Sequence, residues 1–226
     1  AIEQREKELI RTEQLKYVGQ LAAGVAHEIR HPITTIRGFF QLLKDHPYDE
    51  KVFRNYIDII IEELNRMNGI VGELLNLSKP YQLIVKEHNV NELMDEIILL
   101  QKGELYRKNI KILRENECDK LICTDRNRLF QVIINVIQNS KDAFQKEGSI
   151  RISFESTDDT VRIIIADDGP GMPKGVLSKI GTPFYTTKEH GTGLGIATSM
   201  KIMEELEGSF EVTSRIGKGT RIVLTV

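Results

Sequence analysis

The residues best suited to covalent chemistry lie in the stretch 26–32, Ala-His-Glu-Ile-Arg-His-Pro, within a long helical pattern. Apolar residues recur around this stretch at steps of three and four, and His27 falls on the side of the helix away from that stripe. An exposed imidazole beside the carboxylate of Glu28 can act as a nucleophile, because the carboxylate accepts the proton of one ring nitrogen while the other attacks. A helix histidine is more often structural, so His27 and Glu28 are candidate catalytic residues that the rest of the chain must support.

The same letters also allow a metal site. Residues 27–31 satisfy the H-E-x-x-H pattern, in which two histidines one helical turn apart hold zinc and the glutamate serves as a base. Pro32 follows directly and removes an amide donor at the edge of such a site. The only further ligands on offer are carboxylates such as Glu62 and Glu63, which are common on any charged helix. A zinc-dependent hydrolase built on His27, Glu28 and His31 is therefore the alternative hypothesis.

A second set of polar residues lies in the later half of the chain. Asn135 and Asn139 are one helical turn apart, a spacing that can present amide oxygens to a magnesium-bound triphosphate. Asp167 ends an apolar run and precedes Asp-Gly-Pro-Gly, so its carboxylate is suited to accept a hydrogen bond from an adenine amino group. An ordinary helix face and a plain turn are the structural alternatives for these two features.

Glycines gather between residues 169 and 195, a connection long enough to be a lid or a binding loop. Within it, residues 183–188 form a candidate lid segment, and Gly-Thr-Gly-Leu-Gly at 191–195 runs straight into a helical pattern. Glycines at that place let backbone amides face a phosphate at the positive end of the helix dipole. The pattern matches neither a Rossmann unit, which needs a strand directly before the glycines, nor a P-loop, which needs Gly-Lys-[Ser/Thr].

The composition limits the scaffold that could position these residues. The chain has 226 residues, a formal charge of -2 and 28% charged residues of both signs, which gives no basic footprint for nucleic acid. Its apolar runs are too short to span a bilayer. Cys118 and Cys123 favour two reduced thiols in a cytoplasmic protein. Because the chain opens on Ala1 within a helical pattern, we expect a piece of something longer, with any membrane segment outside it.

Helical periodicity predicts a first domain over residues 1–80. One very long helix covers residues 2–44, beginning as a coiled-coil lead-in, and a second runs from about 50 to 77 after a turn at 45–49. The two helices are expected to pack antiparallel, and their apolar stripes stay half covered, so we expect a dimer that completes a four-helix bundle. Ser-Lys-Pro at 78–80 is predicted to be a hinge.

Residues 81–226 carry the alternation of an α/β domain. Its predicted strands are 82–86, 110–113, 121–124, 149–157, 161–167, 209–214 and 220–226, and its predicted helices are 91–107, 126–146 and 195–207, the first of them capped by Asn91.

Taken together and in order, these motifs resemble the signature boxes of the sensor histidine kinases of bacterial two-component systems. The matching segments are a phosphoacceptor box at 26–32, an N box at 135–142, glycine boxes at 167–171, 191–195 and 217–220, and an F box at 183–184. The resemblance spans residues 15–226, and the stretch 29–38 is similar to that of the sporulation kinases of endospore formers.

This resemblance implies an all-α dimerisation and histidine-phosphotransfer hairpin joined to an α/β sandwich ATP-binding domain of the histidine kinase/GHKL type. It implies ATP-dependent autophosphorylation of His27, with Glu28 as the acid–base partner, followed by transfer to an aspartate of a response-regulator receiver domain. The implied partners are a second copy of the chain and that regulator, with no nucleic acid. A coiled-coil adaptor with a degenerate nucleotide domain is a third interpretation, which the presence of Asn139 and Asp167 disfavours.

The implied cofactors are ATP and Mg²⁺, with Asn139 as the metal ligand and Asp167 reading adenine. The implied nucleotide-binding residues are Asn135, Asn139, Asp142, Asp167, Gly169, Gly171, Met172, Lys188, Gly191, Thr192, Gly193, Leu194, Gly195 and Thr220. Two positions depart from the family pattern. His31 stands where Asn or Thr is usual, and Asp142 stands where Lys is frequent, so Lys141 or Lys188 would have to supply a cation to the γ-phosphate.

Overall fold

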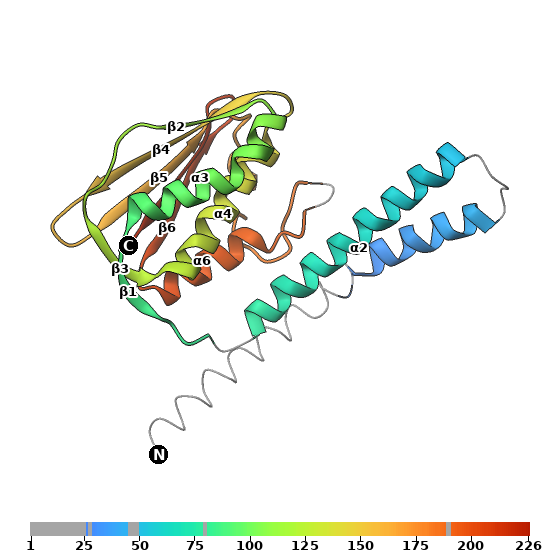
Figure 1. Cartoon of the computed structure of the whole chain (residues 1–226), viewed down its shortest axis with the longest axis horizontal. Helices are drawn as coiled ribbons and strands as arrows, with labels where there is room; N and C mark the ends of the chain where they lie inside the picture. Colours follow the sequence, from blue (N-terminus) through green and yellow to red (C-terminus); the bar gives the residue numbers. More distant parts are fainter. Residues whose placement is uncertain (1–25, 27–28, 45–49, 79–80, 189–190) are drawn as a thin grey trace, which may run out of the picture. The chain divides into compact units, whose positions relative to one another are not determined.

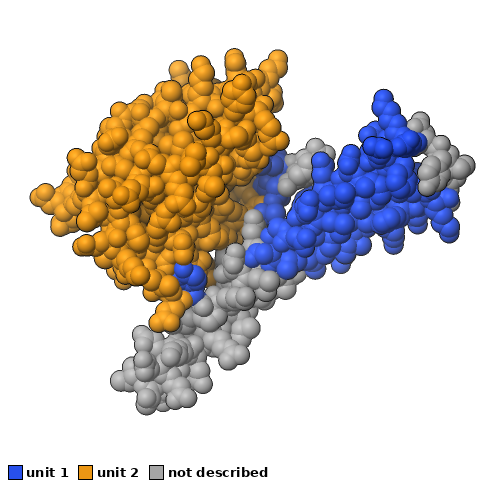
Figure 2. Space-filling model, viewed as in Figure 1, with its two compact units in different colours: residues 1–81, 186–192 blue, residues 82–185, 193–226 orange. Residues whose placement is uncertain are grey.

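The computed structural model of the chain describes residues 26, 29–44, 50–78, 81–188 and 191–226. The chain divides into two compact units (Figure 2). Residues 1–81 with 186–192 form the helical unit, and residues 82–185 with 193–226 form the sheet unit. No helix in the described part of the chain has the length and apolar character needed to cross a membrane.

The helical unit contains two helical segments that lie side by side, residues 29–44 and α2 (Glu50–Ser78) (Figure 1). The rings of Phe39 and Tyr56 join them, with their centroids 5.0 Å apart. The first segment stays helical through Pro32. The proline therefore does not interrupt this helix. The predicted coiled-coil lead-in, residues 3–16, and the predicted turn at 45–49 lie outside the described residues.

Several large apolar side chains of the helical unit remain exposed on the single chain. Between 38% and 55% of the surface of each of these residues is accessible: Ile33, Phe40, Phe53, Leu64 and Val71. The last three recur at steps of eleven and seven, so they share one face of α2. A patch of this kind on a helix face is typical of an interaction surface.

The sheet unit is built on a five-stranded mixed sheet with the order β2-β4-β5-β7-β6. β2 (Ile110–Arg114) runs parallel to β4 (Gly148–Ser156). The other neighbours are antiparallel: β5 (Val161–Asp167), β7 (Gly219–Thr225) and β6 (Ser209–Arg215). A separate ribbon pairs β1 (Val85–Asn89) with β3 (Leu121–Asp125).

Three helices cover one face of that sheet: α3 (Val90–Arg107), α4 (Arg126–Ala143) and α6 (Gly195–Glu205) (Figure 1). The core between the two layers is formed by buried apolar side chains, among them Ile97, Ile133, Ile137, Ile163, Ile165 and Met203. Burial of each such side chain contributes about 1.5–3 kcal/mol. Because strand side chains alternate, residues 161, 163, 165 and 167 of β5 face the helices, and residues 162, 164 and 166 face the other side.

The helix that carries both asparagines is fixed at its start by Asp125. Its carboxylate accepts hydrogen bonds from the backbone N–H groups of Asn127 and Arg128, at 3.0 and 3.1 Å. The same carboxylate accepts the Ile84 N–H at 2.7 Å. A helix cap of this type contributes about 1 kcal/mol, and this one also ties α4 to the chain that enters the sheet unit.

Several predicted boundaries differ from the observed ones by one to three residues, and three of the corrections have a clear physical reason. The first strand occupies Val85–Asn89 rather than 82–86, because pairing with β3 begins at Val85, one residue after Ile84 bonds to the Asp125 side chain. Asn89 rather than Asn91 caps α3, since Asn89 accepts the Asn91 N–H at 2.8 Å. The Asn91 side chain instead bonds to the backbone of Cys118.

The third correction concerns the end of α4. The helix stops at Ala143 instead of 146, because Phe144 takes an extended backbone (φ −81°, ψ 131°) and packs against the core. Gly148 provides the room for this ring, since a Cβ there would lie 2.0 Å from a Phe144 ring carbon. The long connection after β5 also contains a short helix, α5 (Lys174–Leu177).

Candidate functional site

The site is centred on Asp167, the last residue of β5, whose side chain faces the helices and is 6% exposed. Its Oδ2 accepts the Ser140 hydroxyl of α4 at 3.0 Å. Its Oδ1 accepts two backbone N–H groups, those of Gly169 and Thr220, each at 3.1 Å. Burial raises the pKa of the Asp167 carboxyl above its usual range, and these three hydrogen bonds offset only part of that increase. The negative charge of Asp168 raises the pKa further.

This environment defines what Asp167 can do. A carboxylate has about four acceptor positions, and three donors of the protein approach it here. One acceptor position therefore remains for an N–H group of a ligand. The donors come from α4, from the loop after β5 and from β7, so three separate parts of the fold fix the orientation of the carboxylate.

Gly219 permits the close approach of β7 to Asp167. Its backbone has a φ of +82°, and a Cβ there would lie 1.8 Å from the Asp167 carbonyl oxygen. Any side chain at position 219 would push the first residues of β7 away from the end of β5. The Thr220 N–H would then lose its position beside the Asp167 carboxylate, so this position requires glycine.

Ser214 joins the two segments that flank Asp167. Its hydroxyl accepts the Met172 N–H at 2.9 Å and lies 2.9 Å from the Gly219 carbonyl oxygen and 3.0 Å from the Thr220 hydroxyl. The Gly217 N–H donates to the Pro170 carbonyl at 2.8 Å. The loop after β5 and the β6–β7 turn thus form one hydrogen-bonded rim, which includes the predicted residues Met172 and Thr220.

The two predicted asparagines lie on the side of α4 that faces the start of α6. The Asn135 Nδ2 donates to the Gly195 carbonyl and to the Ser199 hydroxyl, both at 3.4 Å. The Asn139 Nδ2 donates to the Asn135 carbonyl at 2.9 Å, so its amide oxygen is turned away from that carbonyl. A Cβ at Gly195 would lie 3.9 Å from the Asn139 Nδ2. The structure therefore brings Asn135, Asn139 and Gly195 together.

The beginning of α6 has the properties of an anion site. Its N-cap, Leu194, is buried and provides no side-chain cap. The backbone N–H groups of a first helical turn need acceptors from outside the helix, and an anion supplies them at the positive end of the dipole. Gly193 precedes this turn with a φ of +66°, and a Cβ there would lie 2.5 Å from the backbone of Phe184.

The sequence suggested that Lys141 could supply a cation to the γ-phosphate, in place of the lysine that is frequent at position 142. The structure does not support this role. Its side chain is fully buried, and its Nζ donates to Gln101 and Gln138 at 2.8 Å and pairs with Glu104. This ammonium group is engaged with α3 and its own helix. The hydrogen bond from Lys141, against a smaller opposing effect of burial, lowers the pKa of Glu104 below its usual range. Lys141 therefore stabilises the α3–α4 interface instead of facing the predicted nucleotide site.

Asp142 is also directed away from Asp167. It lies two residues after Ser140, so the two side chains point to opposite sides of α4. Its Oδ1 accepts the Gln138 side-chain amide at 3.0 Å and pairs with Lys108 of the α3 end at 3.4 Å. Asp142, which was predicted to bind the cofactor, thus lies on the side of α4 that faces α3.

Three further predicted residues lie between positions 188 and 192. Lys188, Gly191 and Thr192 are grouped with the helical unit, where the Lys188 N–H donates to the Thr186 hydroxyl at 3.1 Å and the Gly191 N–H donates to the Lys188 carbonyl at 3.3 Å. His27 and Glu28 lie outside the described residues.

His31, on the described helix, is exposed, and its carbonyl accepts the Thr35 hydroxyl at 3.3 Å. Among the residues that the structure describes, no group of three or more His, Cys, Asp or Glu side chains could hold a metal ion.

Sequence reasoning did not find Ser140 or Ser214. Ser140 interrupts the apolar side of α4 with a small hydroxyl residue, which is a weak signal that a polar partner faces that position. Ser214 has no such signal, because its role depends on the register that pairs it with Thr220.

Two family models match the chain. Residues 17–81 match the His Kinase A (phospho-acceptor) domain. Residues 124–226 match the Histidine kinase-, DNA gyrase B-, and HSP90-like ATPase family. His27 lies in the first range, and the cluster of Asn139, Asp167 and Thr220 lies in the second.

Individual proteins agree with these matches. Sporulation kinase A of Bacillus subtilis (strain 168) is 40% identical over 219 residues, which cover 96% of this chain and 36% of that protein. The crystal structure of histidine kinase ThkA in complex with response regulator protein TrrA is 36% identical, with a TM-score of 0.85, and the match covers 99% of this chain and 65% of that one. The catalytic domain of ThkA in a nucleotide-free form is 34% identical, with a TM-score of 0.57 and coverage of 63% of this chain and 95% of that structure. The chain thus spans little more than a third of the length of the curated relative.

Proposed function

The chain belongs to the sensor histidine kinases of two-component systems, and on this premise we propose that it transfers the γ-phosphoryl group of ATP to its own His27 and then to an aspartate of a response-regulator receiver domain. The observation that carries the ATP half of this proposal is the buried carboxylate of Asp167, held by donors from three parts of the fold with an acceptor position left for a ligand. The match to the phospho-acceptor domain supports the histidine half.

In this proposal the residues around Asp167 and α6 divide the nucleotide between them. Asp167 accepts a hydrogen bond from the amino group of adenine, and the rim formed by Met172 and Thr220 shapes the same end of the site. The uncapped start of α6 receives the phosphates, with Gly193 and Gly195 leaving the backbone accessible. Both ends of the nucleotide thus meet residues that α4 holds in place through Ser140 and Asn135.

Asn139 is the proposed metal residue. Mg²⁺ takes oxygen ligands and keeps several of its waters, so a single amide oxygen at the start of α6 fits its preference. When bound, the ion supplies charge neutralisation on the transferring phosphate. The protein's own part is to hold the Asn139 amide in one orientation, which the bond to the Asn135 carbonyl achieves. We also propose that Lys188, Gly191 and Thr192 bind the nucleotide, and this part of the proposal rests only on their match to the family motifs.

The transfer itself is a substitution at phosphorus. A neutral His27 ring nitrogen forms a bond to the γ-phosphorus, the bond to the bridging oxygen breaks, and ADP leaves with that electron pair. The second ring nitrogen loses its proton to the Glu28 carboxylate. The phosphoryl group then moves to an aspartate carboxylate of the receiver, and the imidazole is regenerated.

The proposal includes the partners and the domain division. Residues 1–80 would form the dimerisation and phosphotransfer domain and residues 81–226 the catalytic domain. The exposed apolar side chains of the helical unit provide a surface for a second copy. A related kinase, ThkA, has been solved with a response regulator protein, and we propose a partner of this class for the present chain.

Incubation with γ-labelled ATP tests the proposal against its alternatives. A kinase gives protein-bound label that is acid-labile and alkali-stable, as expected for a phosphoramidate. A zinc hydrolase gives no label, and neither does an adaptor with a degenerate nucleotide domain. Label that survives acid would indicate a hydroxyl phosphate ester and contradict the proposal.

A further inference from the structure

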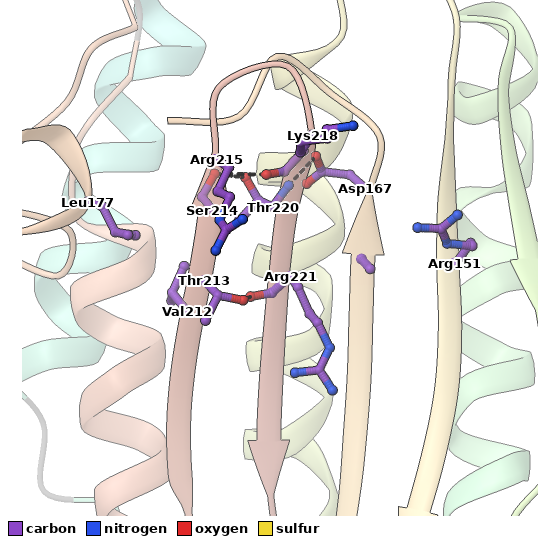
Figure 3. Close-up of a pocket in the computed structure, with 12 residues that line it drawn as sticks. Arg151, Asp167, Leu177, Val212, Thr213, Ser214, Arg215, Lys218, Thr220 and Arg221 are labelled. Atoms are coloured by element: carbon purple, nitrogen blue, oxygen red, sulfur yellow. Dashed lines mark hydrogen bonds between the residues drawn. The ribbon is translucent and has the colours of Figure 1, made fainter. Parts of the chain in front are cut away.

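A basic groove lies on the face of the five-stranded sheet opposite to α3, α4 and α6. Its cavity volume is about 550 Å³. Four lining residues are cationic, and they come from β4, from the end of β6, from the β6–β7 turn and from β7: Arg151, Arg215, Lys218 and Arg221 (Figure 3). Leu177 of α5 lines the same groove. Cavities of this size hold small molecules in many proteins.

The strand register places the arginines of this groove on the sheet face opposite the Asp167 carboxylate. The groove reaches the strand ends, where Asp167, Ser214, Gly219 and Thr220 also line it. Arg151 pairs with Ala166, Ala166 with Arg221, and Arg221 with Thr213, so these residues form one row across four strands. Asp167 follows Ala166 and points to α4, where it bonds to Ser140. Neighbours along a strand point to opposite faces, and the row with Ala166 therefore faces away from the helices.

The spacing of the row suits an anion between two guanidinium groups. Arg151 and Arg221 lie on strands that are two positions apart, which places their Cα atoms roughly 10 Å from each other. Figure 3 shows β5 between them. Ala166, the residue of β5 in this row, adds only a methyl group to the floor. The two arginine side chains can thus approach one ligand from both sides, and guanidinium groups bind phosphate oxygens in pairs.

The charges in the groove are only weakly compensated. Arg151 lies 3.7 Å from Glu115 and Arg221 lies 3.9 Å from Glu155, both at exposed positions where ion pairs are weak. Asp168 adds a further negative charge near Arg151, and its carboxylate also accepts the N–H and hydroxyl of Ser149, at 2.7 and 2.5 Å.

The other two cations are less compensated still. Within the described parts of the chain, neither Arg215 nor Lys218 has an ion-pair partner. The side chain of Asp167, the only acidic residue among those lining the groove, faces the helices. Two of the four cations of the groove therefore have no matching carboxylate in the described structure.

We propose that this groove binds a small oligophosphate, a ligand with at least two linked phosphate groups, on the sheet face opposite the proposed ATP site. Four cations from three strands and a turn match a ligand with several negative charges better than a single carboxylate or phosphate. The site lies on the reverse side of the strand ends that carry Asp167 and Thr220.

Residue-resolved NMR titration of the 226-residue chain with pyrophosphate tests this site. We expect saturable shifts of the backbone amides of Ala166, Thr213 and Arg221. The double variant Arg151→Ala/Arg221→Ala should weaken this binding by at least about tenfold, because two sets of charge-assisted hydrogen bonds are lost. Arg151→Gln/Arg221→Gln should do the same, and it keeps side chains of similar length if the alanine variant unfolds.

The matched control is Arg162→Ala, which removes an arginine from the same sheet face. Arg162 pairs with Glu155, the carboxylate that also faces Arg221, but it does not line the groove. This variant should keep the affinity of the unaltered chain. Three outcomes would overturn the proposal: shifts confined to residues 193–197, groove shifts that persist in both double variants, or equal shifts with sodium chloride at matched ionic strength.

Discussion

At the scale of single residues, Asp167 combines deep burial with three protein donors and space for one more. Asp167→Asn replaces one acceptor oxygen by an NH₂ group. The Ser140 hydroxyl can rotate to accept from this group, but the adenine amino group cannot and would lose its acceptor. We expect ATP affinity to fall at least about tenfold, since a buried donor is left without an acceptor. Calorimetric titration measures this loss. Asp168→Asn is the control, because that side chain is exposed and bonds to Ser149, and ATP affinity equal in the two variants would exclude the role of Asp167.

The raised pKa of Asp167 also has a consequence for stability. The folded carboxyl holds its proton more tightly than the unfolded one, so the folded state binds more protons in the interval between the two pKa values. The free energy of unfolding should therefore rise as the pH falls through this interval, from above the usual Asp range down to about 3.8. Above the interval the contribution is constant.

Urea unfolding of the parent chain and of Asp167→Asn at several pH values isolates the contribution of the Asp167 carboxyl to the free energy of unfolding. The stability of the parent relative to the variant should fall as the pH rises from below 3.8 and then level off. A relative gain of stability on raising the pH would mean that hydrogen bonding dominates over burial.

Single residues also show how far sequence reasoning reaches. Asp167 and Asn139 were predicted as members of one site because each stands in a local pattern, a strand end before glycines and a helical repeat. Ser140 and Ser214 were missed because their partners come from other parts of the fold. Lys141 was misjudged for the same reason, since its burial depends on Gln101 and Glu104 of α3.

Lys141 permits a direct test of that correction. Lys141→Met keeps an unbranched side chain but removes the ammonium group and leaves Glu104 without its partner. We expect a loss of about 1–3 kcal/mol in the free energy of unfolding, with an unchanged rate of ATP-dependent labelling per folded molecule. A large loss of labelling rate in a folded Lys141→Met protein would restore Lys141 to the nucleotide site.

At the scale of elements, α4 is the helix that holds the site together, because it contributes Asn135, Asn139 and Ser140. Its start depends on Asp125. Asp125→Ala should reduce the free energy of unfolding by about 0.5–2 kcal/mol, and the loss of the Ile84 contact adds to this. Chemical denaturation measures the change. Asp119→Ala, at an exposed loop position, serves as the comparison and should have little effect on the free energy of unfolding. Equal effects of the two variants would show that the Asp125 cap does not stabilise α4.

The elements were easier to predict than their ends. Helical periodicity predicted α4, and the apolar run from Ile163 to Ala166 predicted β5, because both patterns are strong. The start of β1 and the end of α4 differ from the predicted boundaries, because both depend on contacts between residues that no short sequence pattern encodes. One is the bond from Ile84 to Asp125, and the other is the packing of Phe144 over Gly148.

At the scale of the whole molecule, the exposed apolar face of the helical unit bears on assembly. Leu64 is 47% exposed on the single chain, between Phe53 and Val71 on one face of α2. Leu64→Glu should place a charge in a dimer interface and shift the chain toward monomer in sedimentation experiments. Leu100→Glu is the matched control, since Leu100 is 62% exposed on α3. A dimer that persists in Leu64→Glu would show that the interface lies elsewhere.

The central claim is that His27 receives the γ-phosphoryl group of ATP, and mass spectrometry of the ATP-treated chain under conditions that preserve phosphoramidates tests it most directly. We expect a single phosphorylated peptide with the modification on His27, absent from His27→Gln and retained in His31→Gln, which alters a histidine one helical turn away. His27→Gln should still bind ATP, because Asp167 and α6 are unchanged. Phosphate on another residue, or undiminished labelling of His27→Gln, would contradict the claim.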